Sequence, residues 1–472
     1  MAKFDLLVKG GFLVDYASRK EGRFDVALEG GRVVEVGPEL NPDRAADVFD
    51  AQGKWVLPGL VDTHVHLTPA RRAVGFPMLA RAGVTCCLEC GGFIEDIIEG
   101  MSLYGSGISV AVLNRLDPGV SISGPDAKKK ELADYLDRSL NAGALGLKLV
   151  GGHHPLTPET TAAAIEVANQ ARAYAAFHCG TTRNGSNLNG LLEALDLAAS
   201  NRLHICHITA YCRGLTHGHP VTETMIALKE LTARPYLVSE SHNGPWNGTS
   251  AELENGIPRS HVTQTCLKMG SFEVSRIGML AAARAGYMRV QKETPREVIY
   301  LGPEEGAAFL EEVDFQTTVS FPVNRRSTAF LTATEKNEKG RFIVTALSTD
   351  GGGIPRNFLL SHGLSLVRFE AWTLLDFVQK CCWAPARMLG LPKKGHLSPG
   401  ADGDLVVVDP DSQEALLTVA GGKIVMAQGL VMGSGGTIIT TSRGVKALGE
   451  KGVSAEAADL EGSLFYRAPE SL

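Results

Sequence analysis

The sequence predicts an α/β protein built on a (β/α)8 barrel of the TIM type, with a small β domain assembled from both chain ends. From about residue 57 to about residue 396, short apolar runs alternate with helix-like stretches of roughly ten to fifteen residues, the rhythm of repeated βα units. On either side of this region the apolar runs are closely spaced and separated by glycine-rich turns. That spacing indicates a β unit rather than βα repeats.

The two outer segments, 1–56 and 397–445, share this β texture. The first contains expected strands at 5–9, 11–15, 25–29, 32–37 and 48–50, and the second at 403–409, 417–419, 423–425 and 436–441. Because the first segment is incomplete as a β unit, we expect the two segments to form one domain. Residues 446–472 are rich in Glu, Ala and Ser and are expected to be a C-terminal tail.

The central segment, 57–396, supplies the barrel. Its eight expected strands are 57–66, 83–90, 108–113, 144–150, 173–178, 203–208, 234–239 and 342–350, and its clearest helices are 77–82, 128–141, 157–172 and 188–201. The helix at 157–172 begins with Thr157 as N-cap and Pro158 at the first helical position. An insertion at about 241–341 separates the last two strands, and we expect it either to add bulk or to wall the substrate site.

Composition and charge exclude several function classes. The chain has 472 residues, 44% of them hydrophobic, and a net charge of -6 with the signs interspersed. This is a globular composition without the basic surface of a nucleic-acid or membrane binder. The sequence has no signal-peptide pattern and nine scattered Cys, so we expect a cytoplasmic protein with reduced thiols.

The segment V-L-P-G-L-V-D-T-H-V-H-L at 56–67 is the centre of the chemistry. Residues two apart lie on one face of a strand, so His64 and His66 point together while Val65 points away. Two imidazoles at a strand end suit a divalent metal ion. A His-x-His pair alone is weak evidence, because such pairs also occur on surfaces and in satisfied cores.

Other ligand-type residues close, or nearly close, the later barrel strands. They are Cys90, Lys148, His178, His207 and Asp350. Parallel strands of a barrel bring these ends to one mouth. Lys148 is unusual because an amine inside an apolar run needs a partner or a modification. Together the set is sufficient for two metal ions that share a bridging group.

With these motifs in order, the sequence resembles the metal-dependent amidohydrolase superfamily over roughly residues 5–425. The resemblance implies a β-sandwich beside the barrel and a site with two divalent ions, of which zinc is the expected metal. It implies His64, His66, His178 and His207 as ligands, with Asp350 as both ligand and proton shuttle. Lys148 falls where many members carry a lysine carbamylated by CO2 that bridges the two metals.

These residues resemble the motifs of two different subfamilies. Cys90-Gly91, residues 143–147 and Asp350-Gly351 look like N-acyl-D-amino-acid deacylases, in which a cysteine is the bridge. Lys148 and residues 204–209 look more like dihydroorotases and hydantoinases, which open cyclic amides. We favour Lys148 as the bridge and keep Cys90 as the alternative.

The resemblance implies a metal-activated hydroxide that attacks an amide carbonyl, with Asp350 moving the proton to the leaving nitrogen. Tyr211 and His242 are candidates to hold the oxyanion, and His153 to contact substrate. A substrate carboxylate would need an arginine with fork geometry, and the candidates are Arg183, Arg325, Arg326 and Arg356.

We therefore expect a hydrolase of a non-peptide amide C–N bond in a small molecule, first a linear N-acyl-(D-)amino acid. The alternative is a cyclic amidase of the hydantoinase, dihydropyrimidinase or dihydroorotase kind. A deaminase or a non-catalytic scaffold is less favoured, since Lys148 and the complete ligand set count against them. Barrel hydrolases of this size often assemble, so we also expect a homo-oligomer.

Overall fold

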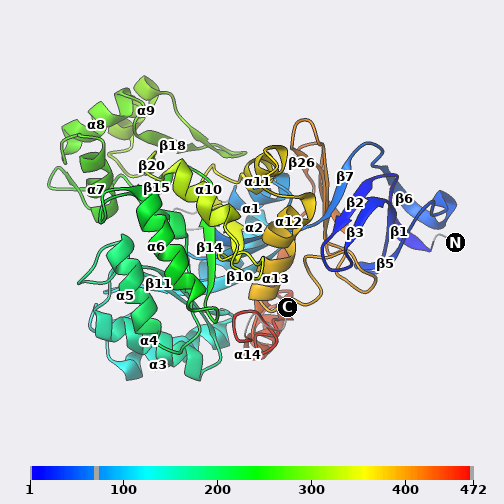
Figure 1. Cartoon of the computed structure of the whole chain (residues 1–472), viewed down its shortest axis with the longest axis horizontal. Coiled ribbons are helices and arrows are strands. Elements are labelled where there is room, and N and C mark those ends of the chain that lie inside the picture. The colour runs from blue at the N-terminus through cyan, green and yellow to red at the C-terminus, as the bar shows by residue number, and fades with distance from the viewer. Residues whose placement is uncertain (1–2, 68–73, 468–472) are drawn as a thin grey trace.

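The computed structural model describes residues 3–67 and 74–467, and it has the predicted barrel with a β domain at one end (Figure 1). The barrel strands are β8 (Leu60–His66), β9 (Val84–Glu89), β10 (Ser106–Leu116), β11 (Gly146–Val150), β12 (Tyr174–His178), β13 (His204–Ile205), β14 (Val238–His242) and β21 (Ala346–Ser348). Neighbours pair in parallel in sequence order. The short strand β22 (Gly351–Gly352) pairs with β8 and closes the ring.

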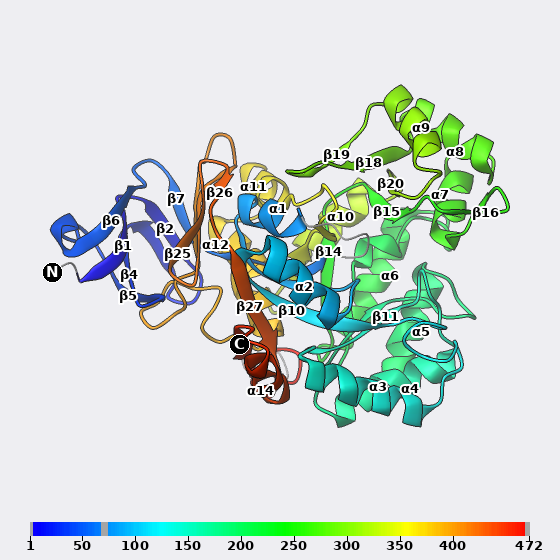
Figure 2. The same ribbon diagram turned by 180° about the vertical axis from the view of Figure 1, so that it is seen from behind.

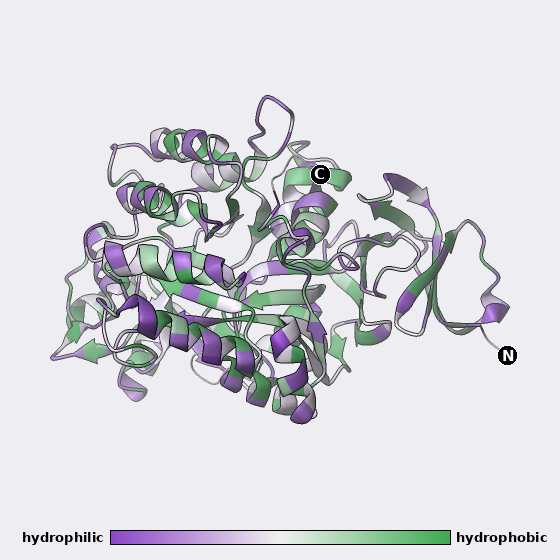
Figure 3. Cartoon of the chain, turned by 90° about the horizontal axis from the view of Figure 1, so that it is seen from below, coloured by the Kyte–Doolittle hydropathy of each residue, from purple (hydrophilic) through white to green (hydrophobic). Residues whose placement is uncertain are grey.

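Helices follow the strands and cover the outside of the barrel. They are α1 (Gly75–Arg81), α2 (Ile94–Tyr104), α3 (Lys129–Ala142), α4 (Pro158–Gln170), α5 (Leu188–Ala198), α6 (Pro220–Thr232), α10 (Arg326–Thr334) and α11 (Leu359–Arg368). They carry hydrophilic and hydrophobic positions side by side, as amphipathic helices on a barrel do (Figure 3). Thr157 accepts a hydrogen bond from the backbone N–H of Thr160, so the expected cap of α4 is present.

Both chain ends meet in the β domain, as the sequence predicts. One sheet has the order β5-β4-β1-β6 and a second has the order β26-β25-β24-β23-β7-β2-β3. The first sheet contains β1 (Phe4–Lys9), β4 (Asp25–Glu29), β5 (Arg32–Gly37) and β6 (Ala45–Asp50). The second contains β2 (Phe12–Asp15), β3 (Lys20–Arg23), β7 (Trp55–Pro58), β23 (Leu405–Val408), β24 (Ala415–Ala420), β25 (Lys423–Ala427) and β26 (Leu430–Val431). An apolar core that includes Val8, Leu13, Val56 and Val407 lies between the sheets.

The last part of the chain differs from the prediction. Strand β27 (Gly435–Thr440), expected in the β domain, instead pairs in parallel with β10 beside the barrel (Figure 2). The tail is also ordered by packing: α14 (Ser442–Glu450) is followed by β28 (Ala455–Ala457), which pairs with β27. Phe465 and Tyr466 are buried against the barrel core: Phe465 stacks on Tyr174 with ring centroids 4.1 Å apart, and the Tyr466 hydroxyl donates to the carbonyl of Ala173 at 2.7 Å.

The insertion between β14 and β21 forms a small α/β unit with its own core, in which Met279, Leu310 and Phe321 are buried. Its elements are β15 (Asn247–Ser250), β16 (Leu253–Glu254), β17 (Ile257–Pro258), α7 (His261–Met269), α8 (Arg276–Arg284), β18 (Arg289–Glu293), β19 (Val298–Tyr300), α9 (Pro303–Glu312) and β20 (Thr318–Phe321). It lies at the far end of the molecule from the β domain (Figure 1).

After α11, a further helical stretch returns the chain to the β domain. It consists of α12 (Leu374–Val378), a π-helical turn (Gln379–Trp383) and α13 (Ala384–Met388). None of the helices in the described parts of the chain is both long and apolar enough to cross a membrane.

Candidate metal centre

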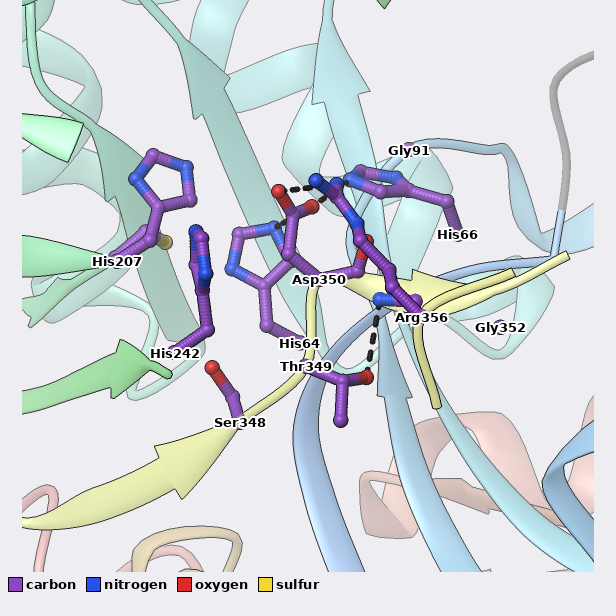
Figure 4. Close-up of polar contacts among 12 residues, drawn as sticks. His64, His66, Gly91, His207, His242, Ser348, Thr349, Asp350, Gly352 and Arg356 are labelled. Carbon is purple, nitrogen blue, oxygen red and sulfur yellow. Dashed lines mark hydrogen bonds and ion pairs between the residues drawn. The ribbon is translucent and has the colours of Figure 1, made fainter. Parts of the chain in front are cut away.

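Ligand-type side chains from the carboxyl ends of the barrel strands meet at one mouth (Figure 4). His64 and His66 lie at the end of β8, on one face as the strand alternation requires. The others are Cys90 after β9, Lys148 in β11, His178 at the end of β12, His207 after β13 and Asp350 between β21 and β22. Every ligand position predicted from the sequence therefore lies at this end of the barrel.

The imidazole rings form a continuous series across the mouth. Ring centroids are 5.3 Å apart for His66 and His64, 5.0 Å for His64 and His207, and 4.3 Å for His207 and His178. Nitrogen atoms of His64 and His66 and an oxygen of Asp350 all lie within 4.8 Å of one another. This spacing gives three ligand atoms around one point.

His64 is held by a buried carboxylate. Its Nδ1 is 2.7 Å from Glu240 Oε1, while its Nε2 faces Asp350 Oδ1 at 3.7 Å. Glu240, in β14, is fully buried and also accepts hydrogen bonds from the backbone N–H of His207 and from the Ser348 hydroxyl. A carboxylate on the far nitrogen of a histidine fixes its tautomer and ring orientation, which leaves Nε2 free for a metal.

Asp350 lies between a histidine and an arginine. Its Oδ1 is 2.7 Å from His66 Nε2, and its Oδ2 is 2.5 Å from Arg356 Nη2. Arg356 is fixed in turn by donating to the carbonyl oxygens of Asp350 and Trp246. Burial opposes ionisation of Asp350, but Arg356 and His66 hold the pKa of its carboxyl well below the ordinary value. The carboxylate is therefore ionised at neutral pH.

The buried histidines of the site are neutral. Burial is the main cause that lowers the pKa of His64, His178 and His207 well below the ordinary value. The positive charge of Lys148 adds to this for His64, and the neighbouring imidazoles add to it for the other two. Neutral imidazole is the form that binds metal.

Both bridge candidates are buried at the base of the site. Lys148 is 1% exposed, and its Nζ is 2.7 Å from Cys206 Sγ. Burial raises the pKa of the Cys206 thiol to about 12 and that of Cys90 well above its ordinary value, so both thiols are neutral at pH 7. Burial alone would lower the pKa of Lys148, but its contacts with Cys206 and Cys90 outweigh burial and raise the pKa above its ordinary value.

Two site residues have strained backbones. His207 has a φ of 30° and Asp350 a φ of 54°, the left-handed region that side chains disfavour by about 1–3 kcal/mol. Hydrogen bonds hold both in place: the N–H of His207 donates to Glu240, and the N–H of Asp350 donates to the carbonyl of His64 at 2.9 Å. Strain of this kind clusters at functional sites.

Three of the predicted substrate contacts lie beside the histidines. The ring centroid of His153 is 5.3 Å from that of His178, and His242 is buried at the end of β14. Tyr211 packs against His207, and its hydroxyl accepts the N–H of Cys179 at 2.8 Å. Arg356 contacts Asp350, as described above.

Arg183 is a correction, because its guanidinium does not join this group. Its side chain is 62% exposed and forms ion pairs with Glu193 and Glu159 at the barrel surface. The charges that neutralise it belong to neighbouring helices, so it is not free to bind a substrate carboxylate.

Glu240, Cys206 and Arg213 are site residues that were not predicted from the sequence. The expected seventh strand, 234–239, ended one residue before Glu240, whereas β14 continues to His242. Glu240 and His242 are two residues apart, the same spacing that singled out His64 and His66. Cys206 had a similar signal, since it directly precedes His207 in an apolar run.

The donor set fits a metal. His207 Nδ1 and His242 Nδ1 are buried side-chain atoms without a hydrogen-bond partner in the described parts of the chain. Buried polar atoms normally find a partner, so two open ring nitrogens beside the other ligand-type residues are consistent with a bound ligand. Imidazole nitrogens and a carboxylate are ligands that zinc accepts. Fold and site together fit a metal-dependent enzyme on a barrel scaffold.

Comparison with known proteins finds similarity to amidohydrolases. The amidohydrolase family model matches residues 318–434. A dihydroorotase of Pelotomaculum thermopropionicum is 26% identical over 440 residues, which cover 87% of this chain and 90% of that protein.

Solved structures agree on the fold. N-acyl-D-glutamate deacylase of Bordetella bronchiseptica, complexed with zinc and a phosphonate inhibitor, superposes with a TM-score of 0.67 at 17% identity, covering 92% of this chain and 99% of the deacylase. Dihydropyrimidinase of Brevibacillus agri gives a TM-score of 0.58 at 17% identity, covering 93% and 99%. Sequence and fold together support membership of the metal-dependent amidohydrolase superfamily, a group of hydrolases that act on carbon–nitrogen bonds.

Proposed function

We propose that the protein hydrolyses a small-molecule amide with two divalent metal ions, and that the first substrate class is a linear N-acyl-(D-)amino acid. The observation that carries the two-ion site is the convergence of four histidines, Lys148 and Asp350 on one mouth. His64 and His66 would hold one ion, and His178 and His207 the other, with Asp350 as a further ligand. Nitrogen ligands dominate, so we infer zinc.

The bridge between the ions is proposed to be Lys148 after carbamylation. Carbamylation joins the neutral amine to CO2 and gives a carboxylate, so the reaction needs an amine that has lost its proton. Burial of Lys148 favours the neutral amine, and removal of the proton must overcome the opposing effect of Cys206 and Cys90. Cys90 remains the alternative bridge, since a metal deprotonates a thiol without a second reagent.

Asp350 is proposed to act as general base and then as general acid. When bound, the ions supply Lewis acidity that lowers the pKa of water and polarises the amide carbonyl. Arg356 keeps Asp350 ionised and orients it, so its Oδ1 can take a proton from the attacking water and deliver it to the leaving nitrogen. His242, with Nδ1 unpartnered in the described structure, can donate a hydrogen bond to the developing oxyanion.

The insertion borders the proposed substrate site, and a linear substrate is favoured by the fold comparison. Asn324, which follows β20, contacts His242 at 3.5 Å, so the insertion borders the mouth. The deacylase fold superposes with the higher TM-score of the two enzymes compared, 0.67 against 0.58.

A cyclic amide is the second candidate because of Lys148. The residue resembles the bridging lysine of dihydroorotases and hydantoinases, and a dihydroorotase is similar to this chain over 440 residues. Both reactions hydrolyse an amide C–N bond, so the proposed roles of Asp350 and His242 are the same.

A substrate screen distinguishes the two candidates. Zinc-loaded protein would be offered N-acetyl-D- and L-amino acids in one arm, and hydantoins, dihydropyrimidines and dihydroorotate in the other. We expect amine release from N-acyl-amino acids. Ring opening without amine release would assign the cyclic reaction. If neither product forms, the proposed function is wrong.

A second experiment identifies the bridge. Lys148→Ala should abolish activity, and short carboxylic acids that take the place of the carbamate should restore part of it. Cys90→Ala should reduce activity only mildly. The reverse pattern, a severe loss in Cys90→Ala and a mild one in Lys148→Ala, would move the bridge to the cysteine.

A further inference from the structure

Arg213 is a buried guanidinium without a carboxylate partner. The residue is 7% exposed, and its Nε and Nη2 both donate to one acceptor, the amide oxygen of Asn324, at 3.2 and 2.9 Å. Within residues 3–67 and 74–467, no Asp or Glu lies within ion-pair distance of it. A neutral amide oxygen does not compensate the cost of burying a charge.

The other buried arginine shows the usual solution. Arg356 has the same fork of donors, but Asp350 pairs with it at 2.5 Å. Arg213 and Arg356 are the arginines in the buried set of the described chain. They therefore differ in one respect, the presence of an anion.

A second cation increases the imbalance at Arg213. Arg325 is exposed, follows Asn324 directly and is near enough for its charge to act on Arg213. It also forms no ion pair with any residue that the structure describes. Burial and the charge of Arg325 both lower the pKa of Arg213, although an arginine remains protonated at neutral pH. Two neighbouring cations without a counter-ion form a site for an anion.

This cationic site is next to the metal centre. Asn324 accepts from Arg213 and places its Nδ2 3.5 Å from His242 Nε2, so one side chain separates the guanidinium from His242. Figure 4 shows His242 on the opposite side of Asp350 from His66 and Arg356. A substrate held at Asp350 can therefore extend past His242 toward Arg213.

We propose that Arg213, assisted by Arg325, binds a negatively charged group of the substrate remote from the scissile amide and selects acidic substrates. This inference rests on the proposed amide hydrolysis. A carboxylate matches the guanidinium fork and would replace the poor acceptor that Arg213 now has. Arg213 is a specificity residue, while the proton transfers remain with Asp350.

Matched substrates test the proposal. N-acetylaspartate and N-acetylasparagine have nearly the same shape and differ in the charge of the side chain. The zinc-loaded wild type should prefer the aspartate derivative. Arg213→Gln should raise KM for that substrate by about 10- to 100-fold, the value of a charge-assisted hydrogen bond, with kcat little changed. KM for the asparagine derivative should stay within about twofold.

Two further variants separate recognition from folding. Arg213→Lys keeps the charge without the fork and should give an intermediate KM. Arg172→Gln, an exposed arginine paired with Glu461, is the control and should match the wild type. Arg213→Gln removes an uncompensated buried charge, so its melting temperature should not fall. An equal rise in KM for both substrates, or a fall in melting temperature with both activities reduced together, would overturn the proposal.

A binding measurement covers the case in which no linear amide is hydrolysed. Calorimetry with succinate and its monoamide, succinamate, needs no turnover. Preferential binding of succinate by the wild type, lost in Arg213→Gln, would support the anion site even if the proposed reaction is wrong. Equal binding of the two compounds by wild type and variant would reject the anion site on its own.

Discussion

Buried charges are paired at the junction with the β domain, whereas at the mouth of the barrel the buried Arg213 has no carboxylate partner among the described residues. At the junction, Lys394 Nζ lies 3.0 Å from Asp402 and 2.8 Å from Asp404. Arg32 also pairs with Asp402, and the N–H of Gly421 donates to Asp404. Each buried carboxylate there has both a cation and a further hydrogen-bond donor.

The mouth has the same kinds of groups with fewer partners. Arg213 has no carboxylate partner among the described residues, and one ring nitrogen each of His207 and His242 has no hydrogen-bond partner there. Both regions are excluded from solvent, so burial alone does not explain the difference. At the junction the protein itself satisfies the buried charges, whereas at the mouth a bound ligand would complete the open groups.

The largest expected effect is on catalysis at the mouth. Asp350→Asn should lower kcat by about 10²- to 10⁴-fold, because an amide cannot carry the proton between water and the leaving nitrogen. Steady-state rates on the substrate found by the screen measure this. Circular dichroism should show an intact fold, and activity within about threefold of the wild type would exclude Asp350 as the shuttle.

A comparably large effect, on stability this time, is expected at the junction. Lys394→Met would leave Asp402 and Asp404 buried without their ammonium group and should cost about 3–5 kcal/mol in the free energy of unfolding. Urea denaturation followed by circular dichroism measures this, with the exposed Lys130→Met as control. The two variants should differ clearly; equal stability would mean that the junction is not held by its charges.

Lys380 is an exception to this contrast between the two regions. It is buried below the barrel, away from the mouth, and donates to the carbonyl of Val344. Burial lowers its pKa from 10.5 to about 7, with Asp376 and Cys381 opposing and Lys336 assisting the shift. Between pH 7 and 10 the unfolded chain therefore binds a proton that the folded chain does not, and stability should rise with pH.

Lys380→Met should remove that rise and stabilise the protein at pH 7 by up to about 4 kcal/mol, the free-energy cost at that pH of lowering the pKa of a lysine from 10.5 to about 7. Urea midpoints at pH 7 and pH 9.5, for wild type and variant, measure both effects. If the wild type loses stability across this range, or if the variant keeps the full rise, Lys380 is not the neutral group inferred.

A smaller effect is expected at Glu240, which supports the proposed metal ligand His64. Glu240→Gln keeps the shape but weakens the hold on His64, so metal affinity should fall by about 10- to 100-fold. Competition with a chelator measures the affinity directly. Ser348→Ala removes another hydrogen bond to Glu240 and serves as the milder control. Unchanged affinity in Glu240→Gln would show that Glu240 has only a structural role.

The smallest effect is expected at Arg183. Arg183→Gln should leave KM within about twofold of the wild type, because the guanidinium pairs with surface carboxylates. A tenfold rise in KM would return Arg183 to the substrate site and weaken the contrast between paired and open cations.

The barrel and the proposed ligands could be predicted because their signals are local. His64 and His66 depend only on the alternation of one strand, and Asp350 on a strand that ends at a glycine turn. The barrel then brings strand ends together wherever they lie in the sequence. Local patterns also gave the cap of α4 at Thr157.

The remaining features depend on partners far apart in the chain. Arg213 meets Asn324 across 111 positions, and Lys148 meets Cys206 across 58, so no local pattern shows either contact. Glu240 was missed by a strand boundary. Strand β27 was misplaced because its glycine-rich turns match those of the β domain, while its pairing with β10 is decided by packing.

Metal content is the most direct test of the central claim. Protein purified without chelators would be analysed by plasma mass spectrometry alongside His64→Ala and His207→Ala. A site of this ligand set predicts about two divalent ions per wild-type chain, with zinc predominant, and a marked loss in both variants. A wild type with fewer than about half an equivalent after incubation with zinc and bicarbonate would contradict the two-metal account.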